Sequence, residues 1–374
     1  MAGDITSSRK LDHIRYTVER DVESREGTLL GYVRVVHNPL PESNLDDVTT
    51  EKDFCGATLR APLMITGMTG GHPETAKINR LLGEIAEHFG IAVGVGSQRA
   101  AIENPELAYT FRVMREAAPS VFLVANLGLP QLAKGYGIRE AMRAVEMVGA
   151  NALAIHLNVG QELYQEEGDR EFTALNKIVE LAESLDVPVI VKETGAGLSA
   201  ETVRLLYRLG IKCFDVSGLG GTSWIKVEAA RARGEGYTPP GEIADKWGNP
   251  TALAIVEART AAPGAYIVGS GGIRTGLDAA KAIALGADIA GVARPVLQAL
   301  MRGGKEGAMK MINMIIYNIK TIILMSGGRR VEDLWRSRIT VWGRLAEEMS
   351  LRGIDPRDYI ERGRLLPLAV RQEW

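Results

Sequence analysis

Short apolar runs recur along the chain and are separated by helix-like stretches. Strands that alternate with helices in this way indicate βαβ units and a parallel sheet. Eight such runs in series are typical of a (β/α)8 barrel, whose active site lies at the carboxyl ends of the strands. The eight predicted strands are residues 61–66, 91–95, 121–126, 152–158, 187–192, 212–217, 265–270 and 287–292.

The chain is longer than a plain barrel, which needs about 250 residues, and the additions can be placed. The chain of 374 residues is interpreted as a single α/β domain, a (β/α)8 TIM barrel over residues 1–374. An irregular insertion, 224–250, follows the sixth strand, and its glycines and prolines suggest a lid or binding loop. The divisions are an N-terminal arm 1–60, a barrel core of about 61–300 and a C-terminal helical tail 301–374.

In the arm, a helix is expected over residues 9–22, with Ser7 and Ser8 as N-cap residues. Residues 38–53 are rich in Pro, Asp and Thr and are expected to form a loop. The arm and the insertion are candidates for covering the active site.

Composition and charge are ordinary for a soluble globular protein. Hydrophobic residues make up 46% and charged residues 24%, and the net charge of −2 gives no footprint for nucleic acid. Cys55 and Cys213 suggest neither a disulfide framework nor a metal motif, and the first ten residues resemble no secretory signal. The most apolar stretch, 308–325, contains two lysines and two asparagines, which favours a helix packed against protein over a membrane span. We therefore expect a cytoplasmic protein without a nucleic-acid partner or a membrane span.

Candidate binding residues follow the first two strands. Gly67, Met68 and Thr69 open a glycine-rich loop, where exposed amides and the lack of side chains allow close approach to a flat ligand. Ser97 and Arg99 follow the second strand, and an arginine at that place suits an anion.

The fourth strand carries the most informative pattern. Alternation places 152, 154, 156 and 158 on one face, so that small residues are followed by His156 and Asn158 at the barrel mouth. Gln161 and Glu162 come directly afterwards. Glu162 is the only acid between residues 153 and 164, which makes it the candidate ligand of a hard cation such as Mg²⁺.

The fifth, seventh and eighth strands together indicate a phosphorylated cofactor. Lys192 shares a face with Ile190 and should enter the barrel, where an ammonium needs an anion. The loops 270–276 and 291–295 match the usual phosphate site of such barrels, with Pro295 at the start of a helix. A cation beside the N1–C2=O edge of a flavin would stabilise its anionic reduced form, so the combination favours FMN over a sugar phosphate.

Several short motifs, taken together and in their order along the chain, are specific for one protein family. The chain resembles the type 2 isopentenyl-diphosphate isomerases over nearly its whole length. One departure is Thr66, where the family is expected to have Asn. The matching motifs are RKLDH (9–13), MTGG (68–71), GSQR (96–99), HLN (156–158), QE (161–162), VKE (191–193), GGT (220–222) and SGGI (270–273).

The resemblance implies a reaction and a set of partners. The family interconverts isopentenyl and dimethylallyl diphosphate by a 1,3-allylic proton shift. It uses reduced FMN as the acid–base cofactor, NADPH or NADH to reduce the flavin, and Mg²⁺ as the metal. Its members are usually homotetramers or larger assemblies.

The resemblance also assigns roles to residues. The catalytic residues would be Gln161, as a proton relay near C2 of the substrate, His156 and Lys192, and the metal ligand would be Glu162. The substrate would be bound by Arg9, Lys10, Ser97, Arg99, His156 and Gln161. FMN would be bound by Gly67, Met68, Thr69, Ser97, Asn126, Lys192, Ser217, Thr222, Gly271, Gly272, Arg274, Ala293 and Arg294.

Two alternatives remain open. An FMN-dependent oxidoreductase of the 2-hydroxy-acid oxidase type needs a base, usually His, near the end of the seventh strand. All five histidines precede the fifth strand, which counts against it. A non-catalytic flavin-binding protein would not need His156, Gln161 and Glu162 clustered after one strand.

Overall fold

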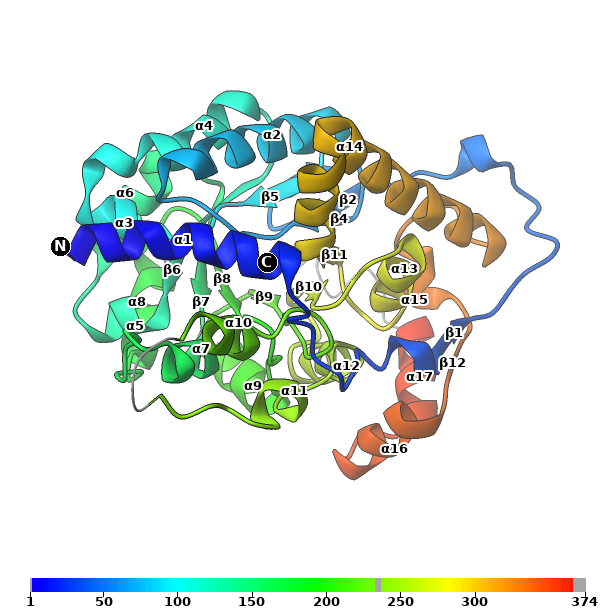
Figure 1. The fold of residues 1–374 in the computed structure, drawn as a ribbon. Coiled ribbons are helices and arrows are strands. Elements are labelled where there is room, and N and C mark those ends of the chain that lie inside the picture. The colour runs from blue at the N-terminus through cyan, green and yellow to red at the C-terminus, as the bar shows by residue number, and fades with distance from the viewer. Residues whose placement is uncertain (1, 233–236, 366–374) are drawn as a thin grey trace.

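Eight parallel strands close into a barrel in this computed structural model, which describes residues 2–232 and 237–365 (Figure 1). Every barrel strand falls on a predicted apolar run, so the predicted (β/α)8 fold is confirmed. Around the barrel the strands are β4 (Leu63–Ile65), β5 (Ala92–Gly94), β6 (Leu123–Gly128), β7 (Ala152–His156), β8 (Val189–Lys192), β9 (Cys213–Asp215), β10 (Tyr266–Ser270) and β11 (Ile289–Val292).

Alternate residues of these strands face the barrel interior and the helices. On β7, Ala152 and Ala154 belong to the interior cluster, whereas Leu153 and Ile155 belong to the outer core beneath the helices. The predicted orientation of β7 is therefore confirmed. The other interior strand residues are Met64, Ala92, Val124, Ile190, Cys213, Val268 and Ile289.

A ring of helices covers the outside of the barrel, and shorter helices lie on the loops (Figure 1). The outer helices are α2 (Pro73–Phe89), α4 (Tyr109–Ala117), α6 (Ile138–Val148), α8 (Leu175–Ser184), α9 (Ala200–Arg208), α12 (Thr251–Ala261), α13 (Gly276–Ala284) and α14 (Arg294–Met325). The short elements are α3 (Arg99–Glu103), η3 (Pro105–Leu107), α5 (Leu129–Ala133) and α7 (Val159–Tyr164).

The end of the barrel opposite the active face is closed by a hairpin that the sequence analysis missed. Strands β2 (Lys52–Phe54) and β3 (Ala57–Leu59) pair antiparallel, and the turn between them has positive φ at Cys55 and Gly56. Phe54 is fully buried, and its ring lies edge-on to Phe122 at 5.7 Å and to Tyr266 at 5.6 Å. The prediction of a continuous loop over 38–53 is therefore wrong at its end, because an aromatic plug is needed inside the barrel.

The arm and the tail also pair with each other. Strand β1 (Val33–Val35) pairs antiparallel with β12 (Ile339–Val341), which lies within the otherwise helical tail. Short helices η1 (Leu30–Tyr32) and η2 (Leu45–Asp47) lie in the arm. The remaining tail helices are α15 (Asp333–Arg336), α16 (Gly343–Leu351) and α17 (Pro356–Leu365).

Helix α14 is the one helix among the described residues that is long and apolar enough to cross a membrane, judged by length and composition alone. Its buried residues Ala308, Ile312, Ile315 and Ile319 recur at helical spacing, and the chain bends at Gly304. Against this stripe the backbone of α13 approaches closely, because a Cβ on Gly276 would lie 2.6 Å from the Ile315 carbonyl oxygen. The stripe therefore packs against protein.

Helix α1 (Ala2–Glu19) lies across the front of the barrel (Figure 1). The predicted caps Ser7 and Ser8 lie inside this helix rather than before it, so that part of the prediction is wrong. At the C-terminal end of α1, the Arg294 guanidinium donates to the carbonyl oxygens of Thr17 at 2.7 Å and Arg20 at 2.9 Å. Carbonyl groups at this end of a helix have no hydrogen-bond donor within the helix, and Arg294 supplies one.

The insertion after the sixth strand is less irregular than predicted. It contains α10 (Trp224–Arg231) and α11 (Ile243–Lys246), while residues 233–236 lie outside the described part. Ser223 caps α10 by accepting from the Lys226 amide at 3.3 Å. Helix α10 packs beside α1, since Trp224 and Val227 join Tyr16 in one apolar cluster.

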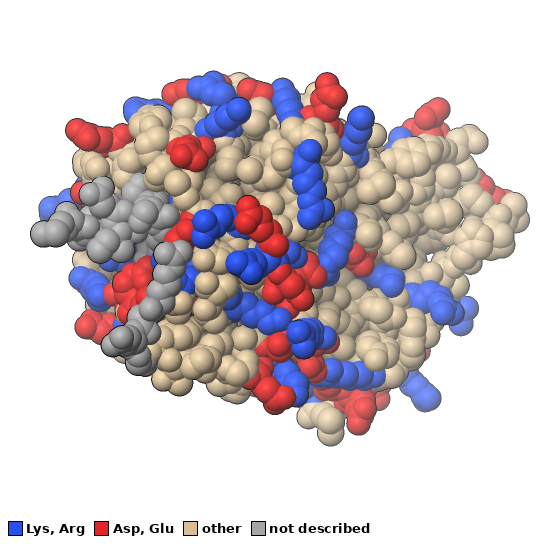
Figure 2. Space-filling model, viewed as in Figure 1, with Lys and Arg blue, Asp and Glu red and all other residues tan. Residues whose placement is uncertain are grey.

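Charges of both signs are mixed over the face that carries α1 (Figure 2). The right-hand end of the same view, where α14 runs, shows few charged residues (Figure 2). Exposed apolar side chains on α14 include Met314, Tyr317 and Met325.

Candidate active site

A cavity of about 1540 Å³, including the part open to solvent, lies at the carboxyl ends of the barrel strands. Every predicted site residue with a described side chain lines it, and only the side chain of Arg9 lies outside the described part. These residues are Lys10, Gly67, Met68, Thr69, Ser97, Arg99, Asn126, His156, Gln161, Glu162, Lys192, Ser217, Thr222, Gly271, Gly272, Arg274, Ala293 and Arg294.

His156 is held as a neutral imidazole. Its Nδ1 lies 2.7 Å from Oδ1 of Asn126, so that nitrogen carries the proton and donates. Burial, followed by the charges of Lys192 and Lys10, lowers the pKa of His156 to about 3. Gly128 of the neighbouring strand leaves the space for this ring, because a Cβ there would lie 2.7 Å from Nε2.

Gln161 is oriented by a carboxylate that the sequence analysis missed. The Gln161 amide donates to Oε1 of Glu228 at 2.8 Å, and His13 Nε2 lies 2.9 Å from the same oxygen. Glu228 also pairs with Arg231 and is 1% exposed. Burial acts to raise the pKa of Glu228, but its partners, His13 first, outweigh it and lower that pKa to about 2. Glu228 therefore stays ionised and fixes the amide of Gln161.

The sequence held a signal for Glu228. It lies among the buried residues Ile225 and Val227 on α10, and a buried acid on an apolar helix face needs a partner. Because α10 falls in the segment expected to be irregular, this pattern was not used.

Glu162 points into the cavity and is 6% exposed. Its two oxygens accept from Nδ2 of Asn158 and from the backbone amide of Asp169, each at 2.8 Å. No group of three or more His, Cys, Asp or Glu side chains suited to a metal occurs among the described residues. A Mg²⁺ ion fits here only in the mode in which one carboxylate, substrate phosphates and waters share its coordination.

Arg99 lies at the cavity wall beside two acids. Its Nε donates to Glu103 at 2.7 Å and its Nη1 to Asp169 at 3.2 Å. The guanidinium is thus preorganised by carboxylates, and an incoming diphosphate would have to compete with them or add to them.

Lys192 enters the barrel as predicted and meets a buried acid. Its Nζ donates to the carbonyl oxygen of Glu193 at 2.6 Å and lies 3.7 Å from Oδ2 of Asp215. The other oxygen of Asp215 accepts from the Ser270 hydroxyl. Lysine, aspartate and serine lie on the adjacent strands β8, β9 and β10.

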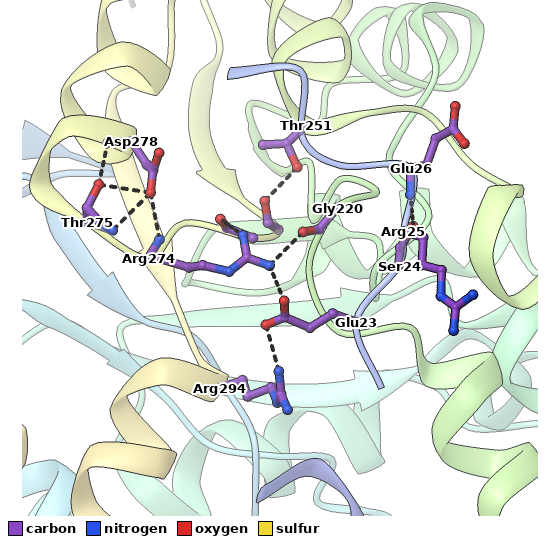
Figure 3. Close-up of polar contacts among 12 residues, drawn as sticks. Glu23, Ser24, Arg25, Glu26, Gly220, Thr251, Arg274, Thr275, Asp278 and Arg294 are labelled. Atoms are coloured by element: carbon purple, nitrogen blue, oxygen red, sulfur yellow. Dashed lines mark hydrogen bonds and ion pairs between the residues drawn. The ribbon is translucent and has the colours of Figure 1, made fainter. Parts of the chain in front are cut away.

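The opposite end of the cavity is built for an anion. Gly271 and Gly272 have positive φ, and a Cβ on either would lie under 2.5 Å from the backbone of the loop after β9. The N-terminus of α14 borders the same cavity, which Ala293, Arg294 and Pro295 line. Arg274 donates to Glu23 at 2.7 Å and Arg294 to the other oxygen of Glu23 at 2.6 Å (Figure 3).

Glu23 was also missed by the sequence analysis. It lies in the arm, and a backbone bridge joins it to Thr222 of the loop after β9. Its carboxylate therefore ties the arm to the two arginines predicted to bind the cofactor phosphate (Figure 3).

The chemistry of the cavity fits FMN. One end offers glycine backbone, two arginines and a helix N-terminus for a phosphate, and Lys192 offers a cation for the ring system. The hydroxyl of Thr69 is buried at the cavity wall and has no hydrogen-bond partner. A polar ring edge would satisfy that group.

Comparisons with known proteins agree with this fold. The family model described as FMN-dependent dehydrogenase matches residues 130–341, which places the chain among the FMN-dependent barrel proteins. Solved structures of mandelate oxidase share the fold. The form with (S)-mandelic acid has a TM-score of 0.60 at 20% identity and covers 91% of this chain and 98% of its own.

Curated relatives are much more similar. The isopentenyl-diphosphate delta-isomerase of Aeropyrum pernix is 60% identical over 99% of both chains. The proteins of the same name from Ignicoccus hospitalis and Metallosphaera sedula are 50% and 46% identical over 93% of this chain and 97% and 96% of theirs. The chain belongs to the isopentenyl-diphosphate delta-isomerase family, so the resemblance seen in its motifs is confirmed.

Proposed function

We propose that this protein interconverts isopentenyl diphosphate and dimethylallyl diphosphate by a 1,3-allylic proton shift, with reduced FMN in the cavity. The observation that carries the proposal is the division of one cavity into two ends. The anion site of Gly271, Gly272 and Arg274 lies at one end, and the cluster of His156, Gln161 and Glu162 lies at the end of β7 and on α7. A prenyl diphosphate and a flavin phosphate each then have a site.

The flavin would be held by groups from most of the barrel loops. When bound, reduced FMN would supply the acid–base group of the proton shift, through its N5 atom. Lys192 would stabilise the anionic flavin, and the glycine loop with α14 would hold the phosphate. The proposed FMN ligands are Gly67, Met68, Thr69, Ser97, Asn126, Lys192, Ser217, Thr222, Gly271, Gly272, Arg274, Ala293 and Arg294.

The substrate diphosphate would be held by charge-assisted hydrogen bonds, which are the strong kind. Its proposed ligands are Arg9, Lys10, Ser97, Arg99 and His156. Neutral His156 gives its one proton to Asn126 from Nδ1, so its Nε2 would meet the diphosphate as an acceptor, through a water or a protonated phosphate oxygen rather than by charge. Glu162 would hold the Mg²⁺ that offsets the charge of the two phosphates.

Proton movement at C2 of the substrate would involve Gln161. Its amide nitrogen is held by Glu228, and its Oε1, which also accepts from Nδ2 of Asn158 at 3.5 Å, would receive the proton from the substrate side with its second lone pair. Helices α1 and α10 pack together over the cavity, and residues of both line it. They would exclude water from a cationic intermediate.

Three further properties belong to the proposal. NADPH or NADH would reduce the flavin before isomerisation begins. The protein would act in the cytoplasm as a homotetramer or larger assembly. The exposed Met314, Tyr317 and Met325 of α14 supply an apolar face suited to contact between subunits.

The test is an anaerobic assay with FMN, Mg²⁺ and isopentenyl diphosphate. Isomerisation should require reduction of the flavin by dithionite or NAD(P)H and should leave the flavin reduced at the end. Oxidation of a 2-hydroxy acid with flavin reduction, and no isomerisation, would instead support the oxidase alternative. Flavin binding without either activity would support a non-catalytic protein.

A further inference from the structure

Asp215 is a buried acid under the active site that no step of the proposed reaction uses. It is the last residue of β9 and is 2% exposed. Cys213, two residues earlier, belongs to the interior cluster, so Asp215 faces the barrel interior as well. It lines a second, much smaller space inside the barrel, together with Lys192 and Asn126.

The contacts of Asp215 are incomplete. Oδ1 accepts from the Ser270 hydroxyl, while Oδ2 is buried without a hydrogen-bond partner and lies 3.7 Å from the Lys192 ammonium. A buried carboxylate is costly unless it is paired. An asparagine of the same shape could bond Ser270 without that cost. The function of Asp215 therefore lies in its charge rather than in its shape.

The two partners of Asp215 line the main cavity, although Asp215 itself does not. Lys192 and Ser270 line the main cavity, and Asp215 joins them from below. A carboxylate at this place attracts the lysine ammonium toward the barrel interior and offsets its charge.

We propose that Asp215 is a positioning residue that moderates the effect of Lys192 on the flavin. The proposal rests on FMN binding in the cavity. Flavin reduction takes up two electrons and one proton to give the anionic reduced form, which a cation stabilises. With Asp215 in place, Lys192 favours the reduced form less than a lone ammonium would.

The test compares the dissociation constants of oxidised FMN and of dithionite-reduced FMN, measured anaerobically. Asp215→Asn should raise the dissociation constant of oxidised FMN relative to that of reduced FMN about tenfold. For a two-electron couple, this corresponds to a rise of ~30 mV in the midpoint potential of the bound flavin. In the Lys192→Met background the same substitution should change the ratio less than threefold. Asp215→Ser, which also removes the charge, repeats the measurement if the asparagine variant folds poorly.

Cys213→Ala is the matched control, since Cys213 lies at an interior position of the same strand and does not line the main cavity. It should leave the ratio unchanged. The proposal would be overturned by an unchanged or lowered ratio on removal of the Asp215 charge. An equal rise in both lysine backgrounds, or an equal rise in Cys213→Ala, would overturn it as well. Failure of the wild type to bind FMN, or an unchanged ratio in Lys192→Met alone, would instead contradict the proposed flavin site.

Discussion

The side-chain amide of Gln161 donates to Glu228 at 2.8 Å, from α7 to α10. The two residues are 67 positions apart in the chain, and the contact joins the end of β7 to the insertion after β9. The orientation of the proposed proton relay thus depends on a helix that belongs to the cover of the site.

Glu228→Gln should impair catalysis more than flavin binding. The variant keeps the size of the side chain but no longer forces the Gln161 nitrogen to face it, and it leaves Arg231 without its buried partner. We expect kcat to fall tenfold or more and the protein to lose about 3 kcal/mol of stability. Steady-state kinetics and thermal unfolding measure both.

Glu167→Gln is the matched control, because Glu167 pairs with the same Arg231 at a more exposed site. It should change kcat less than twofold. Equal losses of kcat in the two variants would remove Glu228 from the positioning of Gln161.

Deleting residues 1–10 should weaken substrate binding. Lys10 lines the cavity, and each lost contact to a charged group is worth about 1.5–3 kcal/mol, or roughly a decade or more of affinity. We expect kcat/KM to fall by one or more decades while FMN affinity stays unchanged. His13 and the bonds from Arg294 hold the rest of α1 in place, so the melting temperature should barely change. Unchanged kcat/KM would remove Arg9 and Lys10 from the site.

Glu162→Gln should reduce the dependence on Mg²⁺. The amide keeps the contact to the Asp169 backbone only in part and loses the charge that attracts the ion. The Mg²⁺ concentration for half-maximal activity should rise at least tenfold, with FMN affinity unchanged. Glu166→Gln on the exposed side of the same loop is the control and should respond to Mg²⁺ like the wild type. A normal Mg²⁺ titration of Glu162→Gln would contradict the metal assignment.

Much of the barrel could be predicted from the sequence because two local rules dominate it. Strands buried on both faces produce short apolar runs, and the carboxyl ends of parallel strands converge at one face. Those rules predict that His156, Lys192 and Arg274 share one face of the barrel, and all three line the cavity.

Other features depend on contacts between distant segments, which local patterns do not specify. Glu23 meets Arg274 across 251 positions, and nothing near it in the sequence indicates that partner. Phe54 plugs the barrel only because the hairpin turns back beneath it. The interior position of Asp215 could be predicted, since alternation from Cys213 places a charged residue on the inner face of a predicted strand.

His156 should make the protein less stable in mild acid. Its pKa is 6.5 in the unfolded chain and about 3 in the native protein, so below pH 6.5 only the unfolded state takes up the proton. Stability therefore falls as the pH decreases from 6.5 toward 3, by up to about 1.4 kcal/mol per pH unit for this group. The free energy of unfolding, measured with denaturant between pH 6.5 and 5, should fall less steeply with decreasing pH in His156→Asn than in the wild type. The exposed His37→Asn should keep the wild-type slope, and equal slopes in all three proteins would contradict a neutral, buried His156.

Glu23→Gln should loosen the arm without unfolding the barrel. The carboxylate bridges Arg274 and Arg294, and partly exposed ion pairs of this kind contribute about 0.2–1 kcal/mol each (Figure 3). Losing both should speed backbone amide exchange in the second half of α1 by roughly two- to thirtyfold, because local opening becomes easier by the sum of the two free energies. Exchange in α13 should stay unchanged. Glu19→Gln, which changes an exposed acid at the end of the same helix, is the control and should show wild-type amide exchange. Wild-type exchange in Glu23→Gln would contradict this role of Glu23 and would mean that Arg294 holds the arm through the carbonyl groups at the end of α1 alone.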